Sequence, residues 1–292
     1  MQVSLALGGG GSRGFAHIGV LKVLEREGVK VRAVAGTSMG GIIAAAYASG
    51  YSPEDIERHA AETPMGELLR LRPSAGGIIS LDRVAAFLRN IFGERTFSEM
   101  RVPLAVTAVD LGTGHSLTLS SGKVVDAVLA TIALPGIFPP QIMGDHRLID
   151  GGALDPVPVR AARALGGGPV VAVALSPAPE EWSQCPPANP LQGLPVLGAL
   201  TRLRTGEALK VLLRTVEICS RAYLETRLQL DRPEVIVRPR VADIGLFDQP
   251  SISKMVGIGA AAMEAALPAL KAESMPLRRV ARRWEELRRS TA

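Results

Sequence analysis

The sequence is poor in several residue types and patterns, and each shortage excludes a class of protein. Only two cysteines, Cys185 and Cys219, occur among 292 residues, so we expect a reducing compartment and no disulfide framework. Aromatic residues make up 4% of the chain, too few for platforms that stack nucleic-acid bases. The N-terminus lacks a basic segment followed by an apolar one, and no uncharged apolar run has membrane-spanning length. We therefore expect neither a secretory signal nor a transmembrane helix.

The excess of positive charge is confined to one end of the chain. The net charge is +5, and residues 276–292 contribute six arginines against two glutamates. A nearly neutral body is not expected to bind nucleic acid. Val280, Ala281, Trp284 and Leu287 recur at helical spacing among the arginines, which is typical of a basic amphipathic helix on an anionic membrane. A solvated tail and a helix packed on its own core are the alternatives.

Hydrophobic residues reach 47%, enough for a folded core, and the chain contains 31 glycines and 21 prolines. Strands are expected over Gln2–Leu7 and Val29–Ala35, and helices over Phe15–Glu27 and Gly41–Ser49. Each strand is joined to the helix after it by a glycine-containing turn. Two such units in succession predict an α/β fold with a parallel sheet and crossover helices.

The rest of the chain continues this alternation. Further helices are expected over Ser52–Ala61, Leu81–Phe92, Lys123–Leu134, Pro156–Leu165, Thr205–Leu230 and Ile252–Leu270, and strands over Pro103–Asp110, His115–Ser120, Leu148–Asp150, Pro169–Leu175 and Glu234–Arg238. Residues 178–195 form a proline-rich insertion with Trp182, either a linker or a lipid-facing lid. We expect one hydrolase domain over residues 1–275, with a core of about 2–165 that bears the motifs, and a basic tail over 276–292.

The turn at Gly36–Gly40 is a candidate nucleophile site. It reads Gly-Thr-Ser-Met-Gly, a G-x-S-x-G pattern between a predicted strand and a predicted helix. A nucleophilic serine must stand out on a sharp turn, where side chains two residues to either side would collide, so Gly36 and Gly40 suit these positions. The helix N-terminus after Ser38 would stabilise developing negative charge. A chance match on a glycine-rich turn is the alternative.

The loop Gly9–Gly14 reads Gly-Gly-Gly-Ser-Arg-Gly and fits two kinds of site. In a dinucleotide fold it would bind pyrophosphate, but an acidic residue should then end the second strand, and Gly36 stands there instead. We therefore favour an anion cradle that faces Ser38, in which backbone N–H groups form an oxyanion hole. Arg13 would shape the loop or bind negative charge, and a solvated arginine at a helix start is the alternative.

A nucleophilic serine needs a base. Of His17, His59, His115 and His146, none follows an acidic residue at a functional turn, as a Ser-Asp-His order would require. His17 is expected to be a packed helix residue. Asp150, followed by Gly151 and Gly152, ends a predicted strand where α/β folds present catalytic groups. Partial burial would raise the pKa of the Asp150 carboxyl enough for it to act as a general base. An ordinary Asp-Gly turn without a catalytic role is the alternative.

Together, and in this order, the three motifs resemble those of the patatin-like phospholipase family, close to its bacterial branch and to the catalytic domain of neuropathy target esterase. The blocks Ala133–Pro140 and Asp243–Asp248 are similar to further parts of the family, so the resemblance spans roughly residues 2–270. It implies a three-layer α/β/α sandwich around a mainly parallel sheet. It also implies a Ser38–Asp150 dyad without histidine. Gly10 and Gly11 would be the main oxyanion donors, and Gly9, Arg13 and Gly14 would complete the loop.

The activity implied by this resemblance is serine lipid acyl hydrolysis through an acyl-serine intermediate. It needs no cofactor or metal ion, and the partner is a lipid or lysolipid substrate. We expect a cytoplasmic protein with peripheral contact to anionic lipid at the inner membrane face; the oligomeric state is left open. No motif position is missing. A lipid-binding or regulatory module with vestigial hydrolysis is the alternative, and a dinucleotide-binding protein is disfavoured by the missing acidic residue.

Overall fold

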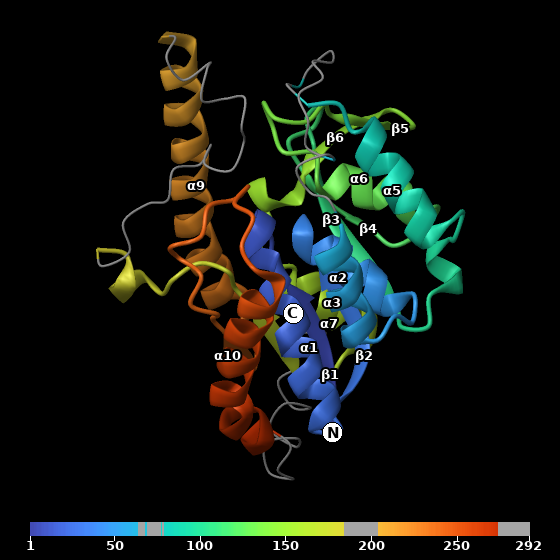
Figure 1. Ribbon diagram of the computed structural model, residues 1–292, viewed down its shortest axis with the longest axis vertical. Coiled ribbons are helices and arrows are strands. Elements are labelled where there is room, and N and C mark those ends of the chain that lie inside the picture. The colour runs from blue at the N-terminus through green and yellow to red at the C-terminus, as the bar shows by residue number, and fades with distance from the viewer. Residues whose placement is uncertain (64–67, 69–76, 78, 184–203, 274–292) are drawn as a thin grey trace, which may run out of the picture.

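The computed structural model describes residues 1–63, 68, 77, 79–183 and 204–273. Within these ranges eight strands form one sheet in the order β5-β6-β3-β2-β1-β7-β8, with β4 paired to β3 (Figure 1). The strands are β1 Gln2–Leu7, β2 Lys30–Gly36, β3 Leu104–Asp110, β4 Ser116–Leu119, β5 Gln141–Met143, β6 His146–Asp150, β7 Val170–Val173 and β8 Val235–Val237. Strands β3, β2, β1, β7 and β8 run parallel, whereas β4, β5 and β6 are antiparallel to their neighbours. The sheet is therefore mixed, with a parallel centre.

Helices cover both faces of this sheet. The α-helices are α1 Ala16–Arg26, α2 Met39–Ala48, α3 Pro53–Glu62, α5 Asp82–Phe92, α6 Val124–Thr131, α7 Val159–Gly166, α9 Arg204–Asp231 and α10 Ile252–Glu273. Short 3-10 helices are η1 Gly11–Phe15, η2 Phe97–Glu99, η3 Gly151–Ala153 and η4 Pro179–Glu181.

The central strand β1 explains why there are helical layers on both sides. Five of its six residues are buried, and successive side chains of a strand point to opposite faces. Val3, Leu5 and Leu7 join one core with α1, α2, α6 and α10. Ala6 joins a second core with α7 and α9. This confirms the expected three-layer α/β/α sandwich.

Helix α10 is held against α1 by close backbone contact. A Cβ atom on Gly19 of α1 would overlap the Val256 carbonyl, and one on Gly259 of α10 would overlap the Ala16 carbonyl. Among the described helices, α10 alone is long and apolar enough to cross a membrane by length and composition. Its buried side chains, which include Met255 and Met263, pack in the first core.

The predicted elements are present, and their ends differ from the prediction in a few places. The helix expected over Lys123–Leu134 ends at Thr131, and tight turns, in which Ala133 and Leu134 donate to the carbonyls of Ala130 and Ile132, lead the chain to Pro135. The helix expected from Pro156 begins at Val159. Strand β5 was not predicted. The predictions for residues 184–195 and for the tail 276–292 lie outside the described residues.

Candidate active site

Ser38 occupies a sharp turn between β2 and α2. Its backbone has φ 54° and ψ −125°, which is left-handed and uncommon for a residue with a side chain. A Cβ atom on Gly36 would overlap the Gly40 carbonyl, and one on Gly40 would overlap the Leu7 carbonyl, so both positions require glycine. The Ser38 N–H donates to Thr131 Oγ1 at 2.9 Å. These contacts hold the serine in the strained geometry that the G-x-S-x-G motif predicts.

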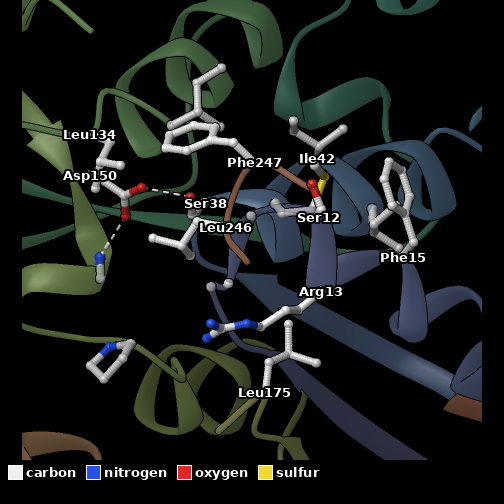
Figure 2. A pocket seen from close by; sticks show the side chains of 18 of the residues that line it. Ser12, Arg13, Phe15, Ser38, Ile42, Leu134, Asp150, Leu175, Leu246 and Phe247 are labelled. Carbon is white, nitrogen blue, oxygen red and sulfur yellow. Dashed lines mark hydrogen bonds between the residues drawn. The ribbon is translucent and has the colours of Figure 1, made fainter. Parts of the chain in front are cut away.

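Asp150 is the hydrogen-bond partner of this serine. Ser38 Oγ donates to Asp150 Oδ2 at 2.6 Å, and the N–H of Gly152 donates to the other carboxylate oxygen at 2.7 Å (Figure 2). Asp150 is 5% exposed, and its burial raises the pKa to about 6. The two hydrogen bonds oppose this shift because they favour the ionised form, but desolvation is the larger cause.

Strand β3 brings these two distant residues together. Its first half pairs with β2, so that Gly36 lies beside Val106. Its second half pairs with β6, so that Asp150 lies beside Ala108. The ends of β2 and β6 therefore meet near the middle of β3. At this junction Thr37 Oγ1 lies 2.7 Å from Thr107 Oγ1, which ties the turn before Ser38 to β3.

The glycine loop lies directly against the serine. A Cβ atom on Gly9 would lie 3.3 Å from that of Ser38. The Gly9 N–H donates to the Pro156 carbonyl at 3.0 Å, so Gly9 shapes the loop. Among the described residues, the N–H groups of Gly10 and Gly11 have no hydrogen-bond acceptor. These are the two donors that the resemblance implies for an oxyanion.

Gly11 and Gly14 allow the loop to pack closely. Gly11 has φ +57°, and a Cβ atom there would overlap the Leu246 carbonyl. A Cβ atom on Gly14 would overlap the Met39 side chain at the start of α2. The loop and the serine turn are thus packed against each other without room for larger residues.

Arg13 anchors the glycine loop from behind. It is 4% exposed, so the alternative of a solvated arginine is wrong. Its Nε donates to the Ile244 carbonyl at 2.6 Å, and its guanidinium pairs with Glu217 of α9 at 3.3 Å. Burial is the largest cause of its lowered pKa. Arg214 and Arg221 bind the same glutamate, so three arginines share one carboxylate beside the loop.

The histidines make no hydrogen bond to Ser38 or Asp150. His17 is fully buried and its Nε2 lies 2.8 Å from the Gly8 carbonyl; burial lowers its pKa to about 4. It is the packed helix residue that was predicted, and it supports the start of the glycine loop. His146 pairs with Asp110 at 3.0 Å, and the ring of His59 packs edge-on against Tyr51.

A cavity of about 310 Å³ opens beside the serine. Ser38, Asp150 and the glycine loop line one part of it. In Figure 2 the side chains of Leu134, Leu246 and Phe247 surround the Ser38–Asp150 pair. The cavity also follows the helices, where its wall is almost wholly apolar: Ile42 and Ala46 of α2, Ile56 and Ala60 of α3, and Val84, Phe87 and Ile91 of α5.

Sequence reasoning missed this apolar wall, as well as Thr131 and Glu217. The amphipathic patterns of α3 and α5 offered a partial signal. An apolar stripe predicts that this face of the helix is buried, but it does not show whether the face packs in a core or lines a cavity. The described part of the chain contains no group of three or more His, Cys, Asp or Glu side chains that could hold a metal ion.

Comparison with known proteins agrees with the motifs. The family model described as patatin-like phospholipase matches residues 5–163, which include the glycine loop, the serine turn and Asp150. The chain belongs to the patatin-like phospholipase family. This confirms the resemblance that the motifs indicated.

Similar proteins occur in bacteria and animals. One NTE family protein of Mycobacterium tuberculosis is 34% identical over 60% of this chain and 49% of its own length. A second is 31% identical over 92% of this chain and 47% of its own length. Patatin-like phospholipase domain-containing protein 6 of Mus musculus is 33% identical over 59% of this chain and 13% of its own length. The chain thus spans about half the length, or less, of these relatives.

A solved structure supports the fold assignment. VipD from Legionella pneumophila aligns with a TM-score of 0.51 at 12% identity, over 93% of this chain and 67% of the other. At this identity the similarity concerns the fold alone.

Proposed function

We propose that this chain is a serine lipid acyl hydrolase that cleaves carboxylic esters through a Ser38–Asp150 dyad. The observation that carries the proposal is the 2.6 Å hydrogen bond from Ser38 Oγ to a buried carboxylate beside a largely apolar cavity. Membership of the patatin-like phospholipase family supports the same class of reaction.

The first half-reaction forms an acyl-serine. Ser38 Oγ attacks the ester carbonyl carbon and its proton passes to Asp150 Oδ2. The carbonyl oxygen becomes an oxyanion, and the N–H groups of Gly10 and Gly11, which have no acceptor among the described residues, stabilise it. When the tetrahedral intermediate collapses, the C–O bond to the leaving alcohol breaks and Asp150 returns the proton to that oxygen.

The second half-reaction releases the fatty acid. Asp150 accepts a proton from a water molecule as the water oxygen attacks the acyl carbon. When this second tetrahedral intermediate collapses, the bond between the acyl carbon and Ser38 Oγ breaks, and Asp150 returns the proton to Ser38 Oγ. A base must be ionised at working pH and still accept a proton in the transition state. A pKa of about 6 satisfies both conditions better than the ordinary value near 4.

The substrate class follows from the cavity. Its wall along α2, α3 and α5 suits an acyl chain, and it gives no comparable place for a long polar substrate. We propose a lipid or lysolipid substrate, met by a cytoplasmic protein at the inner membrane face.

A fluorophosphonate probe tests the proposal, because it forms a stable adduct only with an activated serine. Peptide mass spectrometry should find the adduct on Ser38, with none in Ser38→Ala and much slower labelling in Asp150→Asn. An unlabelled wild-type protein, with and without lipid vesicles, would contradict the proposal and favour a lipid-binding module with vestigial hydrolysis.

A further inference from the structure

The N-terminal half of α9 exposes an apolar stripe. Val211, Leu212 and Ile218 are exposed by 59%, 55% and 52%, respectively. Smaller side chains at 208, 215, 219 and 222 are exposed between them. Helical geometry places all these positions within about one third of the helix circumference. In Figure 1 this half of α9 extends beyond the strands of the sheet.

The opposite face of the same helical turns belongs to the candidate active site. Val216, Glu217 and Ser220 line the cavity. Glu217 binds Arg13 of the glycine loop, and Ser220 Oγ donates to the Gly152 carbonyl at 3.3 Å. One short stretch of α9 therefore separates the catalytic groups from an exposed apolar surface.

Three large apolar side chains on adjacent turns are unusual on a protein surface. Single exposed apolar residues are common, whereas a contiguous group marks an interaction site. The described residues include four other exposed large apolar side chains, at 111, 142, 230 and 236, and none of them is on this half of α9. The stripe is therefore a candidate interaction surface.

Charge indicates which partner fits. The stretch from Arg204 to Thr215 also contains Lys210 and Arg214, against the single acidic residue Glu207. The next acidic residue, Glu217, is already bound by three arginines. An exposed apolar stripe on a helical stretch with more basic than acidic residues is the pattern of a segment that lies in an anionic bilayer interface.

We propose that this face of α9, made by Val211, Leu212, Ile218 and the small residues between them, is the surface by which the protein binds an anionic lipid bilayer. This contact would place the part of the cavity wall that α9 forms next to the lipid surface. The proposed function explains why contact with lipid would be useful, and the inference rests on it for that reason alone. Binding of the protein to vesicles can be measured without measuring hydrolysis.

The exposed Cys219 allows a direct test, because it lies within the stripe. A polarity-sensitive fluorophore is attached to Cys219 in a Cys185→Ser variant of the full chain. Phosphatidylglycerol vesicles should shift the emission to the blue and protect the fluorophore from a water-soluble quencher, whereas phosphatidylcholine vesicles should have a weaker effect. No shift with either kind of vesicle would overturn the proposal.

Charge substitutions identify the surface. Ile218→Glu and Val211→Glu should each weaken vesicle binding by about tenfold or more. Leu230→Glu is the matched control, since Leu230 is 68% exposed at the other end of α9 and should leave binding unchanged. Hydrolysis of soluble p-nitrophenyl butyrate should be unchanged in all three variants, because none of these residues lines the cavity.

The other outcomes are distinct. Equal loss of binding in Leu230→Glu would overturn the assignment of the surface. A wild-type dimer that Ile218→Glu converts to a monomer, without vesicle binding, would show a contact between copies instead. Vesicle binding by a protein that hydrolyses no ester would contradict the proposed function and leave this inference standing.

Discussion

Replacing Asp150 with Asn tests the dyad most sharply, because it removes a base and changes little else. The amide oxygen can still accept the hydrogen bond that Gly152 donates at 2.7 Å, and the side chain keeps its size. An amide cannot take the proton of Ser38. General-base catalysis contributes about 10²–10⁴ in rate, so we expect a loss in kcat/KM of about 10³.

The same substitution should stabilise the fold. Asp150 has an ordinary pKa of 3.8 in the unfolded chain and a pKa of about 6 when folded, so the folded state binds its proton more tightly. The stability of the wild type therefore falls as the pH rises from 4 through 6, and above pH 6 the buried carboxylate costs about 3 kcal/mol. An asparagine does not ionise. We expect Asp150→Asn to have a free energy of unfolding up to about 3 kcal/mol higher at pH 8, with no gain below pH 4.

Two assays check both halves of this prediction. Ester hydrolysis by the wild type should rise with pH through about 6, where Asp150 ionises. Urea unfolding from pH 8 to pH 4 measures the difference in stability between the two proteins. Ser38→Ala is the control, since it abolishes activity and keeps the carboxylate. Activity of Asp150→Asn within tenfold of the wild type would refute the role as base. An equal stability difference at pH 8 and pH 4 would refute the argument from burial.

Three further predictions concern the surroundings of the dyad. Ala46→Phe should narrow the cavity about 12 Å along α2 from Ser38 and lower kcat/KM for long-chain esters at least tenfold, with butyrate esters nearly unaffected. Arg13→Met should misplace the glycine loop and lower kcat by about 10² without a matching change in KM. His17→Gln should reduce acid sensitivity, because the buried imidazole with a pKa of about 4 costs up to about 3 kcal/mol of stability as the pH falls from 6.5 to 4.

Each of these predictions has its own check. If Ala46→Phe lowers kcat/KM equally for long-chain and butyrate esters, the substitution has damaged the catalytic site and has not simply narrowed the cavity. Arg26→Met removes an exposed ion pair between α1 and Glu264 of α10 and should leave kcat unchanged. If it lowers kcat as much as Arg13→Met does, the anchoring role is wrong. Urea unfolding between pH 7 and pH 4.5 compares His17→Gln with the wild type, and parallel curves would contradict the assignment of acid sensitivity to His17.

Local patterns were sufficient to predict most of the elements and the three motifs. The serine turn could be predicted because Gly36 and Gly40 avoid overlap with atoms near them in the fold, and this constraint shows in the letters themselves. The apolar cavity could not be predicted in this way. Its wall comes from α2, α3 and α5, whose apolar residues have the same pattern whether they fill a core or leave a space.

The environment of Arg13 also depended on the tertiary structure. Its partners Ile244 and Glu217 lie more than 200 positions away in the chain, so no local pattern distinguished a buried anchor from a solvated arginine. The exposure of the apolar stripe on α9 also depended on the tertiary structure. The spacing of its residues is visible in the sequence, but only the fold shows that this face of the helix is exposed and that the opposite face lines the cavity.

By itself, the sequence indicated the chemistry available to this protein: a serine on a turn between glycines, a glycine loop that offers main-chain N–H groups, and a carboxylate at a strand end. Those features are local, because backbone conformation and glycine spacing act over a few residues. The family resemblance implied the pairing of Ser38 with Asp150, but only the tertiary structure brings the two side chains together. The two lie 112 positions apart, and they meet because β3 pairs with β2 along its first half and with β6 along its second. Burial at that junction then raises the pKa of the carboxylate, an effect that no pattern of letters contains.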